Sequence, residues 1–94
     1  MNFELIENLS NAFGVSGFEG EVADIATSYA NEFAQTHRDK MGNIYLNYEK
    51  QEEKSLKVLL DAHMDEVGFI VQAIRPNGMI DFLPVGGWVI NNVP

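Results

Sequence analysis

Up to Phe33, the apolar residues of this chain recur every three or four positions, and after Gln35 they alternate with polar ones. The first spacing is typical of amphipathic helices, and the second is typical of half-buried strands. The sequence therefore predicts two N-terminal helices followed by strands.

Two helices are expected before this change of period. The first extends from about Phe3 to Phe13, and Gly14 is expected to end it, since glycine readily takes the left-handed conformation found at many helix ends. The second extends from about Phe18 to Ala34. Ser16 and Glu19 precede its apolar stripe in the pattern S-x-x-E, which predicts a reciprocal capping box at the start of the helix.

Short strands are expected on both sides of Met41-Gly42-Asn43, because Gly and Asn tolerate the positive φ values of tight turns. The strands are Thr36–Lys40 and Ile44–Tyr48, and the charged run 49–55 is expected to be a solvated turn. Leu56–Ala62, with the sequence LKVLLDA, is the most apolar strand candidate. We expect it to be an interior strand covered on both faces.

The last third of the chain predicts a hairpin. Val67–Ile74 and Met79–Val85 are its strands, and Pro76-Asn77-Gly78 is its turn, in which Asn-Gly is a strong hairpin signal. The tail that follows contains Trp88 and Val93 and no charged residue. Natural chain ends are usually polar, so this apolar end predicts that the chain is truncated from a longer protein. The alternative is that the tail docks against its own core.

Composition excludes several classes of function. The chain has no cysteine, which excludes disulfides and thiolate chemistry and fits a reducing, cytoplasmic compartment. Its net charge is −8 with six Lys and Arg residues, so we expect it to bind neither nucleic acid nor an anionic membrane. The N-terminus lacks the basic and apolar regions of a signal peptide, and no run approaches the ~20 apolar residues of a membrane span.

The segment DAHMDE, residues 61–66, carries the clearest candidate chemistry. It follows the most apolar strand candidate, and ligand sites in open α/β sheets lie beyond the carboxyl ends of strands. His63 can offer one ring nitrogen to a metal, and Asp65 can accept the N–H of the other if the chain stays extended. The pattern H-x-D also fits a hydrogen-bonded structural histidine beside a turn-forming aspartate. For His37, that structural interpretation is favoured.

A nucleophilic role for Ser16 is not supported. The nucleophile elbow G-x-S-x-G follows a strand, whereas Gly17 comes directly after Ser16 and no strand precedes it. Gly14 and Gly17 likewise lack the strand that precedes a dinucleotide-binding motif. Helix capping is therefore the favoured interpretation of Ser16.

Three blocks together carry a family resemblance: GVSGFEGE after the first helix, then DKMGNIY, then VLLDAHMDEVGFIV followed by NGMIDFLPVGGW. They resemble the start of the glutamyl aminopeptidase family of tetrahedral aminopeptidases, some of whose members are labelled endoglucanases. The resemblance implies that residues 1–66 open an α/β catalytic domain and that residues 67–94 begin an inserted β-rich dimerisation domain. By the same resemblance, His63 matches the family's first metal ligand and Asp65 matches the aspartate that orients it.

The resemblance further implies a hydrolase that binds two divalent metal ions, zinc or cobalt, and removes the N-terminal residue of peptides with an activated water. The remaining ligands and a glutamate general base would lie beyond Pro94. Family members assemble from dimers into hollow homo-oligomeric dodecamers. A catalytic zinc site uses about three protein ligands, and this chain offers one, so we expect the 94-residue chain alone to be inactive.

Two other functions are compatible with parts of the sequence. The apolar hairpin would suit a non-enzymatic interaction or assembly module, since large apolar patches mark interaction sites. A glycan hydrolase would need a pair of carboxylates flanking a sugar cleft, and nothing in the sequence marks such a pair. A continuation of the chain with further Asp, Glu and His ligands would favour the aminopeptidase, and a stop after Pro94 would favour the module.

Overall fold

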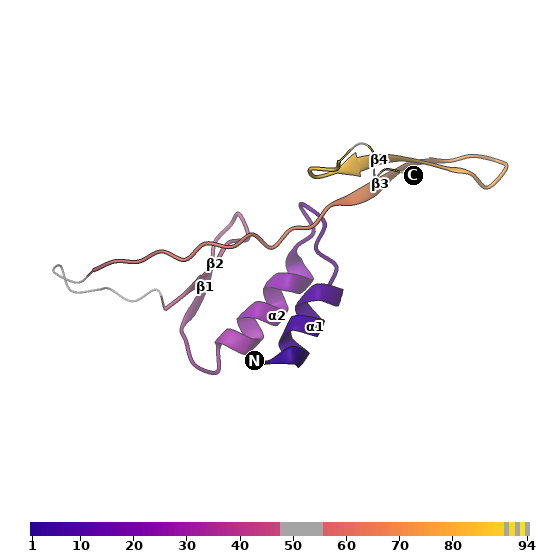
Figure 1. The fold of residues 1–94 in the computed structure, drawn as a ribbon. Helices are drawn as coiled ribbons and strands as arrows, with labels where there is room; N and C mark the ends of the chain where they lie inside the picture. The colour runs from indigo at the N-terminus through magenta and orange to yellow at the C-terminus, as the bar shows by residue number, and fades with distance from the viewer. Residues whose placement is uncertain (48–55, 90, 92, 94) are drawn as a thin grey trace.

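The computed structural model describes residues 1–47, 56–89, 91 and 93. In this part of the chain, two helices precede two antiparallel hairpins (Figure 1). The elements are α1 (Phe3–Asn11), α2 (Gly20–Ala30), β1 (Thr36–Arg38), β2 (Ile44–Leu46), β3 (Gly68–Ile74) and β4 (Ile80–Val85). This order confirms the predicted α/β character of the N-terminal region, whereas the inserted dimerisation domain stays a prediction. Neither described helix has the length and apolar character needed to span a bilayer.

The two helices lie side by side, and α2 contains most of the buried apolar residues that the structure describes. α1 begins after Asn2, whose side-chain oxygen accepts a hydrogen bond from the backbone N–H of Leu5 at 3.1 Å. In the described residues, the buried apolar side chains are small: Ala12, Val22, Ala23 and Ala30. Hydrophobic stabilisation grows with the apolar area removed from water, so this core stabilises the helix pair only weakly.

The prediction that Gly14 ends α1 in a left-handed conformation is wrong. The helix ends at Asn11, and Ala12 leaves it with extended backbone at φ −66 and ψ 143. Gly14 is needed for space instead, since a Cβ there would lie 2.8 Å from Val22 Cγ2 and 3.2 Å from the backbone oxygen of Met64. This glycine therefore lets the end of α1 approach the segment that contains His63.

The predicted capping box is also wrong. Glu19 is the N-cap of α2, and no side chain caps this helix. Glu19 Oε1 accepts a hydrogen bond from the N–H of Gly17 at 2.7 Å, and the Ser16 hydroxyl donates to Asp65. Gly17, with φ 90, inserts a turn before the helix, which places Ser16 away from the cap position.

The last turn of α2 is tighter than predicted. The helix ends at Ala30 rather than Ala34, because the N–H of Glu32 bonds to Tyr29 and that of Phe33 bonds to Ala30, three residues back in each case. Bonds of this kind close a helix end as successive turns. The helix is confirmed, and only its boundaries differ.

The hairpin of β1 and β2 is confirmed around its predicted turn. His37 pairs with Tyr45 across the two strands, and Gly42 has φ 90 in the turn between them. Asp39 closes this turn, since its carboxylate accepts hydrogen bonds from the backbone N–H groups of Met41 and Asn43, each at 2.9 Å. The predicted end of the second strand, at position 48, and the charged run 49–55 lie outside the described residues.

The prediction of a buried strand at Leu56–Ala62 is wrong. Among the described residues, none forms a strand with this segment, and Leu56, Leu59 and Leu60 are at least 86% exposed. A strand requires neighbours that take its backbone hydrogen bonds and cover its side chains. The described part of the chain supplies neither for this segment.

The C-terminal hairpin is confirmed. β3 and β4 are in register from Gly68 opposite Val85 to Ile74 opposite Ile80, with a bulge between Val71 and Ala73. Next to the turn, Arg75 forms an ion pair with Asp81 at 2.8 Å. The hairpin extends away from the helices (Figure 1), and the chain measures 64 × 27 × 26 Å.

Trp88 folds back on this hairpin. Its ring stacks on Phe69 with centroids 4.6 Å apart, and its Nε1–H donates to the backbone oxygen of Gly68 at 2.8 Å. Trp88 therefore packs against the C-terminal hairpin, which lies apart from the buried residues of the helices. Beyond Trp88, Val89 is 63% exposed.

Candidate functional site

His63 and Asp65 lie on the extended segment between the two hairpins, and their side chains are in contact. His63 Nδ1 is 2.9 Å from Asp65 Oδ1 and 3.0 Å from the backbone oxygen of Asp65. The His63 side chain is 85% exposed, and that of Asp65 is 38% exposed. The expected side-by-side placement of the two residues is therefore present, with the imidazole on the surface.

The two acceptors define the tautomer of His63. The carboxylate oxygen and the carbonyl oxygen beside Nδ1 both accept hydrogen bonds, so Nδ1 carries the proton. In the neutral ring, Nε2 then keeps its lone pair. A neutral imidazole nitrogen whose partner nitrogen donates to a carboxylate is the usual form of a metal-binding histidine.

Asp65 holds a second partner with its other oxygen. The Ser16 hydroxyl donates to Asp65 Oδ2 at 2.8 Å. The hydrogen bond from Ser16, followed by that from His63, holds the pKa of the Asp65 carboxyl below its ordinary value. At neutral pH, Asp65 is therefore a carboxylate that accepts from both neighbours.

Backbone contacts attach the loop before α2 to the extended segment that contains His63, Asp65 and Glu66. Glu66 N–H donates to the backbone oxygen of Gly14 at 2.8 Å, and Glu66 Oε1 accepts from the N–H of Gly14 at 3.3 Å. Val15 and Glu66 form an isolated parallel bridge. These contacts bring the residues before α2 beside a segment about fifty positions later in the chain.

His63 and Asp65 line a pocket of about 300 Å³. Its walls come from the His63 segment, the start of α2 and the first hairpin, and they include Asp61, Glu19, Arg38, Met41 and Asn43. Arg38 is held by an ion pair with Asp24 at 3.1 Å. The pocket thus presents carboxylates and a fixed guanidinium beside the imidazole.

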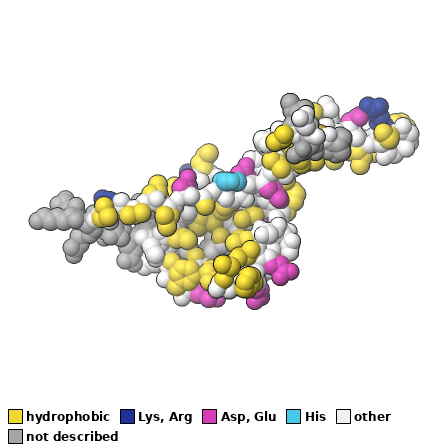
Figure 2. All heavy atoms as spheres, viewed as in Figure 1, with side chains coloured by type: hydrophobic (Ala, Val, Ile, Leu, Met, Phe, Trp, Pro, Cys, Tyr) yellow, Lys and Arg dark blue, Asp and Glu magenta, His cyan; other side chains and the backbone are white. Residues whose placement is uncertain are grey.

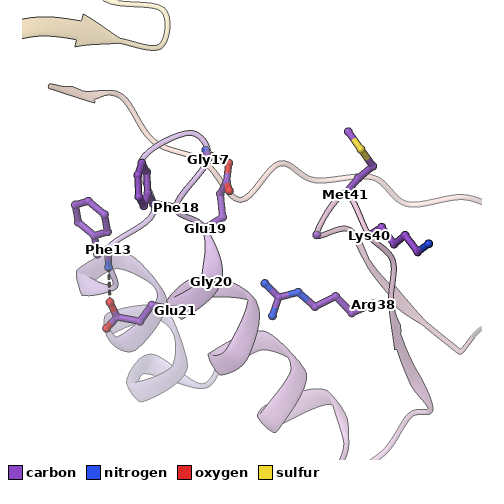
Figure 3. A pocket seen from close by; sticks show the side chains of 10 residues that line it. Phe13, Gly17, Phe18, Glu19, Gly20, Glu21, Arg38, Lys40 and Met41 are labelled. Carbon is purple, nitrogen blue, oxygen red and sulfur yellow. Dashed lines mark hydrogen bonds between the residues drawn. The ribbon is translucent and has the colours of Figure 1, made fainter. Parts of the chain in front are cut away.

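A second depression of about 550 Å³ adjoins this pocket and shares four lining residues with it: Glu19, Arg38, Met41 and Gly42. Figure 3 shows Phe13 and Phe18 on its helical side and Arg38, Lys40 and Met41 on the hairpin side. The rings of Phe13 and Phe18 meet edge to face at 6.3 Å. The turn of the first hairpin therefore forms a wall of both hollows.

The donor set for a metal ion is incomplete in the part of the chain that the structure describes. No group of three or more His, Asp or Glu side chains is placed there to surround a cation. His63 Nε2 alone fits a ligand by its exposure and tautomer. A catalytic zinc site uses about three protein ligands, so the described residues alone do not make up such a site.

Sequence reasoning placed His63 and Asp65 together but missed Ser16. The pattern S-x-x-E is a local signal and pointed to a helix cap, whereas the observed partner of Ser16 lies 49 positions away. The resemblance rests on both GVSGFEGE and HMDEVGF, but it gave no indication that these two blocks contact each other. His37 does not line the His63 pocket. Its ring faces Tyr45 across the first hairpin, with the ring centroids 6.1 Å apart.

Residues 42–94 match the pattern of the M42 glutamyl aminopeptidase family. This chain belongs to that family. The family match includes both His63 and Asp65 and confirms the family that the sequence blocks resemble, although the first block, residues 14–21, precedes the matched residues.

Named relatives align with nearly the whole of this M42 family chain. It is 35% identical over 91 residues to the SgcX protein of Escherichia coli and 34% identical over 87 residues to the glutamyl aminopeptidase of Lactococcus lactis. It is 29% identical over 89 residues to the lysyl aminopeptidase of Pyrococcus furiosus. These alignments cover 92–93% of this chain and 24–25% of each relative, so the chain spans about a quarter of their length.

Proposed function

We propose that this chain is the N-terminal segment of a metal-dependent aminopeptidase that hydrolyses the N-terminal residue from peptides. The observation that carries the proposal is the His63–Asp65 contact, in which Nδ1–H donates to a carboxylate and Nε2 stays available as a ligand. Membership of the M42 family and relatives named as glutamyl and lysyl aminopeptidases support the same reaction.

In this proposal, each residue has a defined task. His63 binds one divalent cation, zinc or cobalt, through Nε2, and Asp65 keeps the proton on Nδ1 and holds the ring in orientation. Two bound cations supply the charge that polarises the scissile carbonyl and activates water. The other ligands and the general base belong to the rest of the protein, so the 94-residue chain alone is inactive.

Homo-oligomeric assembly, from dimers to a dodecamer, is part of the same proposal. Its support in this chain is the exposed apolar surface of the C-terminal hairpin, where Ile70, Val71 and Ile74 are 50–72% exposed. Exposed apolar side chains that lie next to one another mark surfaces that bind other protein surfaces.

The test is His63→Ala in the full-length protein. We expect the variant to lose one metal ion per chain and most of its activity, while circular dichroism shows an unchanged fold. Metal content is measured by mass spectrometry. Activity is measured on a panel of aminoacyl-nitroanilides that includes glutamyl and lysyl substrates, because the relatives are named for both.

His37→Ala is the matched control, since His37 pairs with Tyr45 in the first hairpin and lies outside the set of residues that line the His63 pocket. It is expected to retain metal and activity. Full metal occupancy in a well-folded His63→Ala protein would overturn the ligand assignment.

A further inference from the structure

Ser16 lies in the loop between α1 and α2, 49 positions before Asp65, and yet the two side chains are joined by a hydrogen bond of 2.8 Å. The bond reaches Oδ2, whereas His63 Nδ1 is bound to Oδ1 at 2.9 Å. Each oxygen of the carboxylate therefore has its own donor. The result is a chain of hydrogen bonds from Ser16 through Asp65 to His63.

Helix capping does not account for this serine. α2 begins at Gly20 with Glu19 as N-cap, and no side-chain hydrogen bond caps it. The N–H of Gly17, the residue between Ser16 and Phe18, is satisfied by Glu19 Oε1. The Ser16 hydroxyl is thus directed at Asp65 and away from the helix end.

The position of Ser16 is set by backbone contacts rather than by its own side chain. Gly14 exchanges backbone and side-chain hydrogen bonds with Glu66, and Val15 bridges to Glu66. The two segments approach so closely that a Cβ on Gly68 would overlap the side chain of Val15. Removing the Ser16 hydroxyl should therefore leave the loop in place and remove only the bond to Asp65.

We propose that Ser16 is a positioning residue for the metal-ligand histidine, holding the Asp65 carboxylate in the orientation that fixes His63. The proposal rests on the proposed function, in which His63 is a ligand. In the described part of the chain, both hydrogen bonds of the His63 ring go to Asp65, and the ring is 85% exposed. Without Ser16, Asp65 Oδ2 turns to water and the carboxylate rotates more freely. The ring then keeps the backbone oxygen of Asp65 as an acceptor but is held less firmly in one direction.

The experiment compares Ser16→Ala, Ser16→Thr and Ser10→Ala in the full-length protein. Ser10 is an exposed serine of α1 and is the matched control for loss of a hydroxyl. Zinc affinity is measured by competition with a chelating dye. We expect Ser16→Ala to weaken zinc binding about 3–10-fold, less than the ~10–100-fold typical of a residue in direct contact with the ligand. Ser16→Thr, which keeps the hydroxyl, and Ser10→Ala should both bind like the wild type.

A double-mutant cycle separates positioning from a general structural role. In an Asp65→Ala background, the Ser16→Ala change should cause no further loss of zinc affinity, because the route through Asp65 is already absent. An equal loss in both backgrounds would overturn the proposal. So would zinc binding in Ser16→Ala that equals that of Ser10→Ala.

A second measurement does not depend on bound metal. In metal-free protein with ¹⁵N-labelled histidine, the His63 signals, assigned by their absence in His63→Ala, report the fraction of ring protonated at Nδ1. We expect Ser16→Ala to lower the fraction of ring protonated at Nδ1, although the backbone oxygen of Asp65 still accepts from part of it, and an unchanged fraction would count against the proposal. Metal retained in His63→Ala would defeat the proposed function, whereas a normal Ser16→Ala protein would defeat only the role of Ser16.

Discussion

Asp65 is the residue on which the candidate site depends, because its two oxygens connect two parts of the chain that are far apart in sequence. One oxygen accepts from His63 and the other from Ser16. The residue types H-x-D were enough to predict the first contact, because both residues belong to one extended segment. The second contact could not be predicted, because it depends on how the loop before α2 docks.

Asp65→Asn is expected to weaken metal binding only in part. The amide oxygen of asparagine can still accept from His63 Nδ1–H, but it is neutral and holds the imidazole less strongly than a carboxylate. We expect a loss of about 10–100-fold in zinc affinity, measured by titration against a chelating dye in the full-length protein. Affinity equal to the wild type would mean that Asp65 serves only to shape the segment.

The stability of the turn in the first hairpin is expected to depend on pH through the Asp39 carboxyl group. Hydrogen bonding from the Asn43 side chain is the largest cause that holds the pKa of Asp39 below 3.8, with smaller contributions from backbone N–H groups and Tyr45. Because the pKa is lowered in the folded state, the carboxylate stabilises the turn above pH ~4, and this contribution is lost as pH falls through the lowered value. Asn43→Ala should raise the pKa of Asp39 toward 3.8.

The pKa of Asp39 can be followed by ¹³C NMR of its carboxyl carbon. Asn8→Ala, at an exposed position of α1, is the control and should leave this pKa unchanged. A pKa that does not move in Asn43→Ala would show that the backbone donors alone hold the carboxylate.

At the scale of elements, the sequence was informative wherever the signal was local. The helices follow from apolar spacing, and both hairpins follow from turns that contain glycine at positive φ, Gly42 and Gly78. Prediction failed where a partner was remote. Leu56–Ala62 has the composition of an interior strand, but a strand forms only beside another strand, and its described neighbours do not pair with it.

Gly14→Ala tests the close packing between the end of α1, α2 and the His63 segment. The added Cβ would meet Val22 at 2.8 Å and the Met64 backbone at 3.2 Å, and backbone cannot rotate away as a flexible side chain can. We expect the variant to lose about 1–3 kcal/mol of stability in the full-length protein, measured by urea unfolding.

Gly20→Ala is the matched control for Gly14→Ala. A Cβ on Gly20 has no neighbour within 4 Å, and alanine favours the helix that begins there. The control should be neutral or slightly stabilising. If both variants unfold at the same urea concentration, Gly14 has more room beside Val22 and Met64 than these distances indicate.

At the scale of the whole molecule, the chain exposes much of its apolar surface. Its radius of gyration is 18.0 Å, whereas a compact domain of this length would have about 12 Å. Hydrophobic side chains are spread over the surface of the extended segment and of the C-terminal hairpin (Figure 2). This surface fits a segment that is covered by other parts of a longer protein or by other copies of the chain.

The 94-residue chain on its own is therefore expected to self-associate and to have no peptidase activity. Leu56, Val58, Leu59 and Leu60 are 74–91% exposed, and leaving such side chains in water costs about 25 cal/mol per Å² of apolar area. The extended segment, which pairs with none of the described residues, and the edges of β3 and β4 can pair with other chains, because few charged residues interrupt them. The expected inactivity has a separate cause, since the described residues hold no group of three or more His, Asp or Glu side chains placed to surround a catalytic metal.

Light scattering and nitroanilide cleavage with added zinc or cobalt test the two expectations independently. Leu59→Lys places a charge in the middle of the extended segment and should reduce association, whereas Ser28→Lys, at an exposed position of α2, should leave it unchanged. If Leu59→Lys and Ser28→Lys associate equally, the extended segment is not the contact. A strictly monomeric and folded chain would mean that the hairpin and the segment cover each other in solution. Metal-dependent cleavage by the isolated chain would mean that its residues supply more ligands than His63 alone.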